Sequence, residues 1–173
     1  MELLSPAGDL EKLETVYRFG ADAAYIGLSG FSLRRRADDV APESVADELR
    51  RIKGERKLYG ALNIYFHNAD LRRLEEQIDA IAVLPLDAVI VSDIGAVPVI
   101  RRSLPNVDLH LSTQANCLNT EAARLYHDLG FSRIIPAREM TLEALRELKS
   151  TLPDLEVETF VHGAMCLAYS GRC

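Results

Sequence analysis

The sequence contains no run of about 18 consecutive apolar residues, which is the shortest stretch expected of a membrane-spanning helix. It also opens without the basic and long apolar stretches of a secretory signal, since residues 1–6 read MELLSP. Cysteine is scarce: three residues, an odd number, argue against the paired framework of a disulfide-rich secreted domain. These absences predict a cytoplasmic protein with no membrane span.

Positive charge is in short supply as well. The chain has 20 Lys and Arg residues and 26 Asp and Glu residues, so its net charge is −6. A polybasic nucleic-acid binder needs excess positive charge to neutralise phosphates, so a histone-like protein is excluded, whereas a local basic patch is not. Apolar residues make up 48% of the chain, which excludes wholesale disorder, and 173 residues suit one domain.

What the sequence does contain is a regular alternation of short apolar runs and helical periodicities. The apolar runs predict strands at residues 2–5, 23–27, 57–64, 87–92, 107–111, 132–136 and 155–161. The periodic segments between them predict helices at residues 9–19, 43–53, 70–83, 94–103, 119–129 and 141–151, although Pro98 falls inside one of them. Seven strands alternating with six helices are typical of a parallel sheet with crossover helices.

Two architectures fit this alternation, a doubly wound open sheet and a (β/α)8 barrel. No G-x-G-x-x-G motif follows the first strand, so the dinucleotide-binding form of the open sheet loses support. A complete barrel takes about 250 residues, and this chain stops one helix, one strand and a final helix short of that. We therefore expect an α/β fold of the (β/α)8 TIM-barrel type, incomplete here, with residues 1–173 as the N-terminal portion of a truncated barrel domain.

Polar residues gather at the carboxyl ends of the predicted strands, where both architectures place their chemistry. Each has a structural interpretation too: a hydroxyl or amide can hold a turn, an Arg–Glu pair can be a solvent-exposed ion pair, and a histidine can be structural. Their coincidence at one edge favours an active site. The candidate catalytic residues are Asn63, Ser112, Gln114, Arg138, Glu139 and His162.

Two further groups of residues point to ligands. The run Arg34-Arg35-Arg36 follows the second strand and can bind a phosphate or carboxylate, although it can also be a solvated loop. Cys166 and Cys173 lie seven residues apart in a loop rich in small residues, and thiolates select iron–sulfur clusters, zinc or copper(I). Their spacing is not C-x2-C, so two free thiols remain an alternative.

A third cysteine and the residues of a hydrolytic triad also fall at this predicted edge. Cys117 can be a further ligand, but a small buried side chain is the simpler interpretation. Ser112, His162 and Asp93 make a Ser/His/Asp triad conceivable. Neither a G-x-S-x-G elbow nor an H-E-x-x-H motif supports hydrolysis.

Several of these segments together resemble the collagenase-like peptidase family, peptidase U32. They are residues 2–8 (ELLSPAG), 20–27 (GADAAYIG), 31–34 (FSLR), 61–63 (ALN), 110–116 (HLSTQAN) and 161–173 (VHGAMCLAYSGRC). The resemblance implies a (β/α)8-type barrel with a cysteine-ligated 4Fe-4S cluster. It implies oxygen-independent hydroxylation of a tRNA wobble uridine, of an rRNA cytidine or of ubiquinone precursors, with prephenate as the oxygen donor in the RNA-directed branches.

The resemblance also assigns roles. Cys166 and Cys173 match the first two cluster cysteines, and the other two are expected beyond the end of this chain, in the full-length protein. Arg34 is expected to bind the cofactor or co-substrate. Cys117 and the segments 38–39 and 93–95 depart from the usual family pattern.

Three functions follow from the resemblance: part of an iron–sulfur-dependent hydroxylation enzyme, a peptidase as the family name says, or a non-catalytic fragment or subunit. The expected partners are RNA or a small-molecule substrate, with self-association through open barrel edges or pairing with another U32 subunit.

Overall fold

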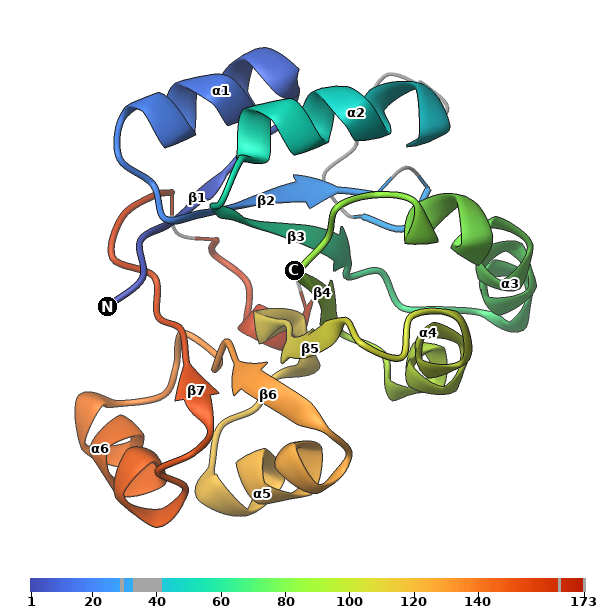
Figure 1. Cartoon of the computed structure of the whole chain (residues 1–173). Helices are drawn as coiled ribbons and strands as arrows, with labels where there is room; N and C mark the ends of the chain where they lie inside the picture. The colour runs from blue at the N-terminus through green and yellow to red at the C-terminus, as the bar shows by residue number, and fades with distance from the viewer. Residues whose placement is uncertain (29, 33–41, 165, 173) are drawn as a thin grey trace. The chain divides into compact units, whose positions relative to one another are not determined.

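The computed structural model describes residues 1–28, 30–32, 42–164 and 166–172, with Arg34 and Cys173 outside this set (Figure 1). The chain forms two compact units, Met1–Val107 and Asp108–Cys173. Each unit is described by itself below.

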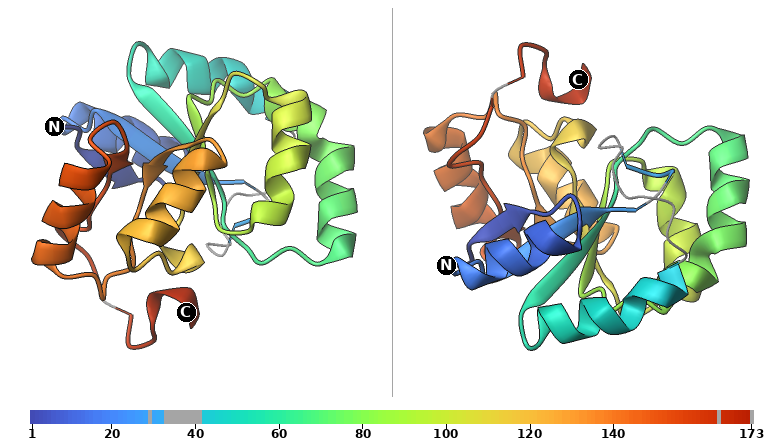
Figure 2. Two further views of the ribbon diagram at one scale, coloured as in Figure 1. Left: turned by 90° about the horizontal axis from the view of Figure 1, so that it is seen from below. Right: turned by 90° about the horizontal axis from the view of Figure 1, so that it is seen from above.

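The first unit contains a four-stranded parallel sheet in which the strands follow chain order. Its strands are β1 (Leu4–Pro6), β2 (Ala23–Gly27), β3 (Lys57–Leu62) and β4 (Ala88–Val91). Between and after them come α1 (Leu10–Arg18), α2 (Pro42–Lys53), α3 (Asn68–Ala82), the short 3-10 helix η1 (Ile94–Ala96) and α4 (Val97–Ser103). Helix α1 lies beside α2, and α3 beside α4 (Figure 2).

The second unit repeats this plan on a smaller scale. Three parallel strands follow chain order: β5 (Asp108–Leu111), β6 (Phe131–Ile134) and β7 (Glu156–Val157). The helices are η2 (Thr113–Ala115), α5 (Thr120–Asp128), α6 (Leu142–Thr151) and η3 (Ser170–Arg172).

The predicted fold class is confirmed. The described residues hold seven strands and six α-helices in alternation, and within each unit the strands pair in parallel with their neighbours in sequence. Sequential parallel strands joined by helices are the arrangement of a (β/α)8-type barrel, and the described residues supply seven such strands.

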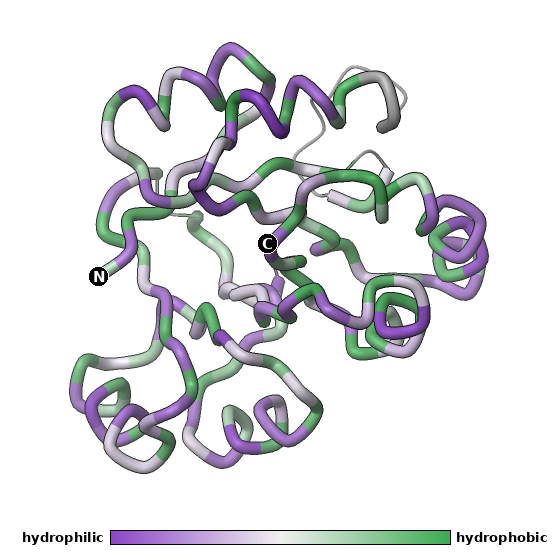
Figure 3. The backbone as a smooth tube through the Cα atoms, in the orientation of Figure 1, coloured by the Kyte–Doolittle hydropathy of each residue, from purple (hydrophilic) through white to green (hydrophobic). Residues whose placement is uncertain are grey.

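Strand β4 is apolar on both faces. All four residues of β4, an Ala-Val-Ile-Val run, are buried, as expected of a strand covered by helices. Along the outer helices, hydrophilic and hydrophobic positions alternate (Figure 3), and α1 turns Leu13 and Tyr17 into the core. Asp9 caps α1, because its side chain accepts a hydrogen bond from the Lys12 backbone N–H. No helix in the described ranges is long and apolar enough to cross a membrane.

Two elements differ from the sequence-based prediction. The helix expected at 94–103 is divided into η1 and α4, with Pro98 at the start of α4, where its missing N–H leaves no helical hydrogen bond unmade. The strand expected at 155–161 is reduced to Glu156 and Val157. The last hydrogen bond of this pairing runs from the Glu158 N–H to the carbonyl oxygen of Ile134, the residue at which β6 ends.

Candidate functional site

In the first unit, hydrogen bonds hold the loops that follow β3 and β4 together. Asn63 is half-buried directly beyond β3, and its carbonyl oxygen accepts a hydrogen bond from Ser92 Oγ at 3.2 Å. Asp93, after β4, accepts from the backbone N–H groups of Phe66 at 2.9 Å and Gly95 at 2.8 Å. Asn63 therefore lies where the sequence predicts it, at the carboxyl end of a strand.

In the second unit, Ser112 and Thr113 stabilise the turn that follows β5. Ser112 is buried, and its Oγ accepts a hydrogen bond from the Gln114 N–H at 3.4 Å as the N-cap of η2. Thr113 donates its hydroxyl to the carbonyl oxygen of Pro136 at 3.0 Å, which joins the turn to the segment after β6. Ser112 Oγ also donates to Gln114 Oε1 at 3.5 Å, so both hydroxyls make hydrogen bonds within this part of the fold.

Arg138 and Glu139, after β6, both bind Ser170 of η3. The Ser170 hydroxyl accepts hydrogen bonds from the Arg138 backbone N–H at 3.1 Å and from its Nε at 3.2 Å. The Ser170 N–H in turn donates to Glu139 Oε1 at 3.0 Å, and Arg138 Nη2 donates to the Ala168 carbonyl oxygen at 3.3 Å. These two side chains thus position the segment that carries Cys166, although Ser170 lies more than 30 residues away in sequence.

This network also sets the charge of Glu139. Partial desolvation raises the pKa of the Glu139 carboxyl, but hydrogen bonds from its own backbone N–H and from Ser170 lower it, as does the positive charge of Arg138. The hydrogen bonds and the Arg138 charge together outweigh the desolvation. The pKa of Glu139 therefore lies below its ordinary value, and the carboxylate is ionised at neutral pH.

His162 is not part of this network. Its ring is exposed, and within the described residues no hydrogen bond or ion pair engages it. The structure thus brings together Arg138 and Glu139 through Ser170, and Ser112 and Gln114 through η2, but it does not join His162 to either pair.

The described cysteines differ in their accessibility. Cys117 is 1% exposed, and burial raises the pKa of its thiol, so it fits the interpretation of a small buried side chain. Cys166 is of intermediate exposure and forms no disulfide with another described cysteine. A 4Fe-4S cluster takes four thiolates, and the described residues contain no group of three or more metal-binding side chains. These residues by themselves therefore do not fit a complete cluster site.

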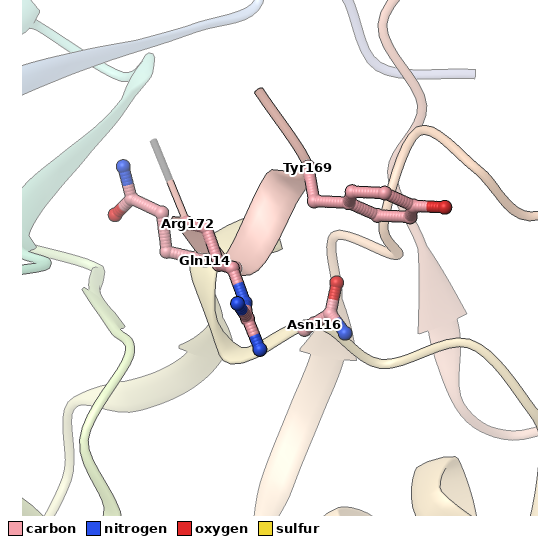
Figure 4. A pocket seen from close by; sticks show the side chains of 5 residues that line it. Gln114, Asn116, Tyr169 and Arg172 are labelled. Carbon is pink, nitrogen blue, oxygen red and sulfur yellow. The ribbon is translucent and has the colours of Figure 1, made fainter.

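A pocket of about 370 Å³ opens to solvent beside this network (Figure 4). It lies between η2 and η3, which are neighbours in the fold. Gly171 lines it where a Cβ would come within 2.7 Å of the Asn116 Cβ, so only glycine permits this approach. Spacing along the chain does not reveal that η2 and η3 touch, so of the lining residues only Gln114 is a predicted site residue. The lining consists of Gln114, Asn116, Tyr169, Gly171 and Arg172.

The family of the chain is shown by comparison with known proteins. The profile of peptidase family U32 matches residues 8–173. The chain belongs to this family. A solved structure of a U32 peptidase superposes with a TM-score of 0.71 and 16% identity, over 92% of this chain and 67% of that one, which supports the same fold.

Three curated relatives carry different names. The chain is 45% identical over 175 residues to tRNA hydroxylation protein P of Helicobacter pylori, covering 100% of this chain and 42% of that protein. It is 34% identical over 173 residues to a 23S rRNA 5-hydroxycytidine synthase of Escherichia coli, covering 100% of this chain and 26% of that protein. It is 31% identical over 185 residues to a collagenase of Porphyromonas gingivalis, covering 99% of this chain and 44% of that protein. The chain therefore spans less than half the length of each.

Proposed function

We propose that the protein takes part in the oxygen-independent hydroxylation of RNA, at a tRNA wobble uridine or an rRNA cytidine. The observation that carries this proposal is the 45% identity, over the whole chain, to tRNA hydroxylation protein P. The relative named for rRNA hydroxycytidine synthesis supports the same chemistry on a second RNA. Ubiquinone precursors are the alternative substrate, but none of the relatives named above points to them.

The residues at the carboxyl ends of the strands are proposed to bind and orient the substrate and an anionic oxygen donor such as prephenate. Asn63 in the first unit, and Ser112, Gln114, Arg138 and Glu139 in the second, follow their strands as this role requires. Guanidinium groups bind carboxylates through paired N–H donors, which suits Arg138 and also Arg34, whose placement lies outside the described residues. His162 follows β7 and, being exposed, is free to meet a substrate.

Cys166 and Cys173 are proposed to supply two thiolates to a 4Fe-4S cluster that other cysteines complete. Support comes from the chemistry of the residues: Cys166 is accessible, whereas Cys117 is buried with a raised thiol pKa. In the full gene product, we expect Cys166→Ser and Cys173→Ser to lose the bound iron and sulfide, and Cys117→Ser to keep them. Full iron content in both of the first two variants would refute this assignment.

The cellular setting follows from the proposed substrate. A protein that modifies tRNA or ribosomal RNA works in the cytoplasm, where these RNAs are used. Strand edges left without a partner tend to pair with another chain, so we propose self-association or pairing with a second U32 subunit. Light scattering tests this, and a monomer that persists at high concentration would contradict it.

Nucleoside mass spectrometry tests the proposed hydroxylation. The gene is expressed in a bacterium that lacks its own tRNA and rRNA hydroxylation proteins, and the purified RNAs are digested to nucleosides. We expect a uridine or cytidine that has gained one oxygen atom only when the gene is present. Identical nucleoside profiles with and without the gene would contradict the proposal.

A peptidase is the second candidate, because one relative is named a collagenase. A serine nucleophile needs a base within hydrogen-bond reach. In the second unit the Ser112 hydroxyl caps η2, and within the described residues His162 makes no hydrogen bond that could activate it. Casein or gelatin cleavage that disappears in Ser112→Ala would nevertheless establish this activity, so the assay is a direct comparison of the two functions.

A further inference from the structure

The pocket between η2 and η3 holds a basic side chain that differs from the others of its unit. Within the described part of Asp108–Cys173, no hydrogen bond or ion pair engages the Arg172 guanidinium. Every other Arg and Lys of that unit has a partner: Arg124 binds Glu121, Arg133 binds Glu156, Arg138 binds Ser170, Arg146 binds Glu143, and Lys149 binds the carbonyl oxygens of Pro153 and Leu155.

An unengaged guanidinium in a pocket is suited to an anionic ligand. Guanidinium groups bind phosphate and carboxylate through two parallel N–H donors, which gives the contact direction as well as charge. Arg172 lines the pocket, and in Figure 4 its guanidinium lies next to the Asn116 amide. The ligand class at this point is therefore a phosphate or a carboxylate with a hydrogen-bonding group nearby.

The Tyr169 ring adds a second requirement. The residue is 65% exposed, and its ring extends along the pocket beside Asn116 (Figure 4). An exposed aromatic face next to a phosphate-binding cation is how single-stranded RNA is held: the base stacks on the ring, and amide groups bind its edge. Asn116 is exposed and supplies both an amide donor and an amide acceptor.

The openness of the pocket decides between a nucleotide and a small carboxylate. Sites for small molecules enclose most of the ligand surface. This pocket opens to solvent, and its Tyr169, Asn116 and Arg172 side chains are all exposed. An open platform suits one nucleotide of a longer strand, whose neighbours continue into solvent.

We propose that this pocket binds one nucleotide of a single-stranded RNA segment, with its base on Tyr169, its phosphate on Arg172 and its base edge on Asn116. The substrate class rests on the proposed function, and the assignment adds the residues that hold the RNA. The Gly171 position, where a Cβ would collide with Asn116, keeps η2 and η3 close enough for the three side chains to act on one nucleotide.

RNA-binding measurements on the purified protein test the assignment. The probe is a fluorescently labelled single-stranded oligouridylate, followed by anisotropy at several salt concentrations. We expect Tyr169→Ala to weaken binding about tenfold, in the range found for stacking residues, and Tyr169→Phe to retain it. Arg172→Gln should weaken binding and lower the slope of log K against log salt by about 0.7, the value for one phosphate contact on a single strand.

Matched controls separate the pocket from general surface effects. Phe19→Ala removes an exposed aromatic residue outside the pocket, and Arg146→Gln removes an exposed cation on α6; both should bind RNA like the wild type. Equal binding by the wild type, Tyr169→Ala and Arg172→Gln would overturn the site. Unchanged RNA affinity with loss of hydroxylated product in Arg172→Gln would assign the pocket to a small anionic co-substrate and would also overturn it.

The RNA-binding measurements and the hydroxylation test can fail separately. If the wild type forms the hydroxylated nucleoside but the pocket variants bind RNA normally, the proposed function stands and the nucleotide site is wrong. If the wild type neither binds RNA nor forms the product, both are wrong.

Discussion

At the scale of single residues, Ser170 joins two segments that are far apart in sequence. Its hydroxyl accepts hydrogen bonds from Arg138, and its N–H donates one to the Glu139 carboxylate. Ser170 is 1% exposed. Nothing in the local sequence distinguishes Ser170 from the other serines of the chain. Its role follows from tertiary contacts with Arg138 and Glu139, which the sequence alone does not predict.

Replacing Ser170 tests this junction. In Ser170→Ala the partly buried Arg138 N–H and Nε lose their acceptor, which costs about 1–3 kcal/mol of unfolding free energy. Urea denaturation measures the change. Ser150→Ala is the matched control, because this hydroxyl is exposed on α6 and its loss should cost less than about 0.5 kcal/mol. Equal stability of the two variants would show that the Ser170 contacts are not formed.

The close approach of Gly171 and Asn116 makes a second prediction. An added Cβ at Gly171 meets the Asn116 Cβ at 2.7 Å, so Gly171→Ala should cost about 1–3 kcal/mol. Asn116 has a positive φ of 57°, which glycine adopts without strain, so Asn116→Gly removes the obstructing atom and should restore stability in the double variant. Gly8→Ala, whose added Cβ meets only Lys12 at 3.9 Å, is the control. Additive losses in the double variant would contradict the contact.

Glu139 gives a prediction about pH. Its folded-state pKa lies below the ordinary value of 4.5, so the carboxylate stabilises the fold above that pH, and the stabilisation is lost as the pH falls below 4.5 toward the folded-state pKa. Wild type and Glu139→Gln are compared by their urea midpoints as a function of pH. We expect the wild type to lose its advantage over the variant below pH 4.5, whereas a constant difference would contradict the lowered pKa.

At the scale of elements, the sequence predicts where most strands and helices lie, but not how long β7 is. Apolar and β-branched residues at 155–161 favour a longer strand, whereas pairing is limited by the partner strand, which ends at Ile134. The length of β7 thus depends on its hydrogen bonds to β6, which the periodicity of its own sequence does not predict. The split of residues 94–103 into η1 and α4 has a local cause, Pro98, and was visible in the sequence.

The shortness of β7 makes its ion pairs important. Arg133 on β6 is largely buried and binds Glu156 Oε2 through Nε at 2.7 Å, with a longer contact to Glu158 at 3.4 Å. Arg133→Ala should therefore cost about 2–3 kcal/mol, because it leaves the partly buried Glu158 without its cation. Arg146→Ala, which breaks an exposed pair with Glu143, should cost less than about 1 kcal/mol. Thermal melting compares the two, and a smaller loss for Arg133→Ala would contradict this role.

At the scale of the whole molecule, the fold class could be predicted because each level of the sequence agrees with it. Alternating apolar runs and amphipathic segments predict parallel strands joined by helices, and that alternation is found throughout the described residues. The candidate site could be predicted only as a set of strand ends. Its contacts, such as those of Arg138 with Ser170, join residues about 30 positions apart, and no periodic pattern encodes them.

The central claim is that this chain serves the oxygen-independent hydroxylation of RNA and that Cys166, unlike the buried Cys117, is needed for it. The most direct test is the content of hydroxylated nucleoside in RNA from cells grown without oxygen, lacking their own hydroxylation proteins and carrying the gene as wild type, Cys166→Ser or Cys117→Ser. The account predicts the hydroxylated nucleoside in the wild type and in Cys117→Ser, and its loss in Cys166→Ser. Absence of the nucleoside from the wild-type cells, or its full retention in Cys166→Ser, would contradict the account.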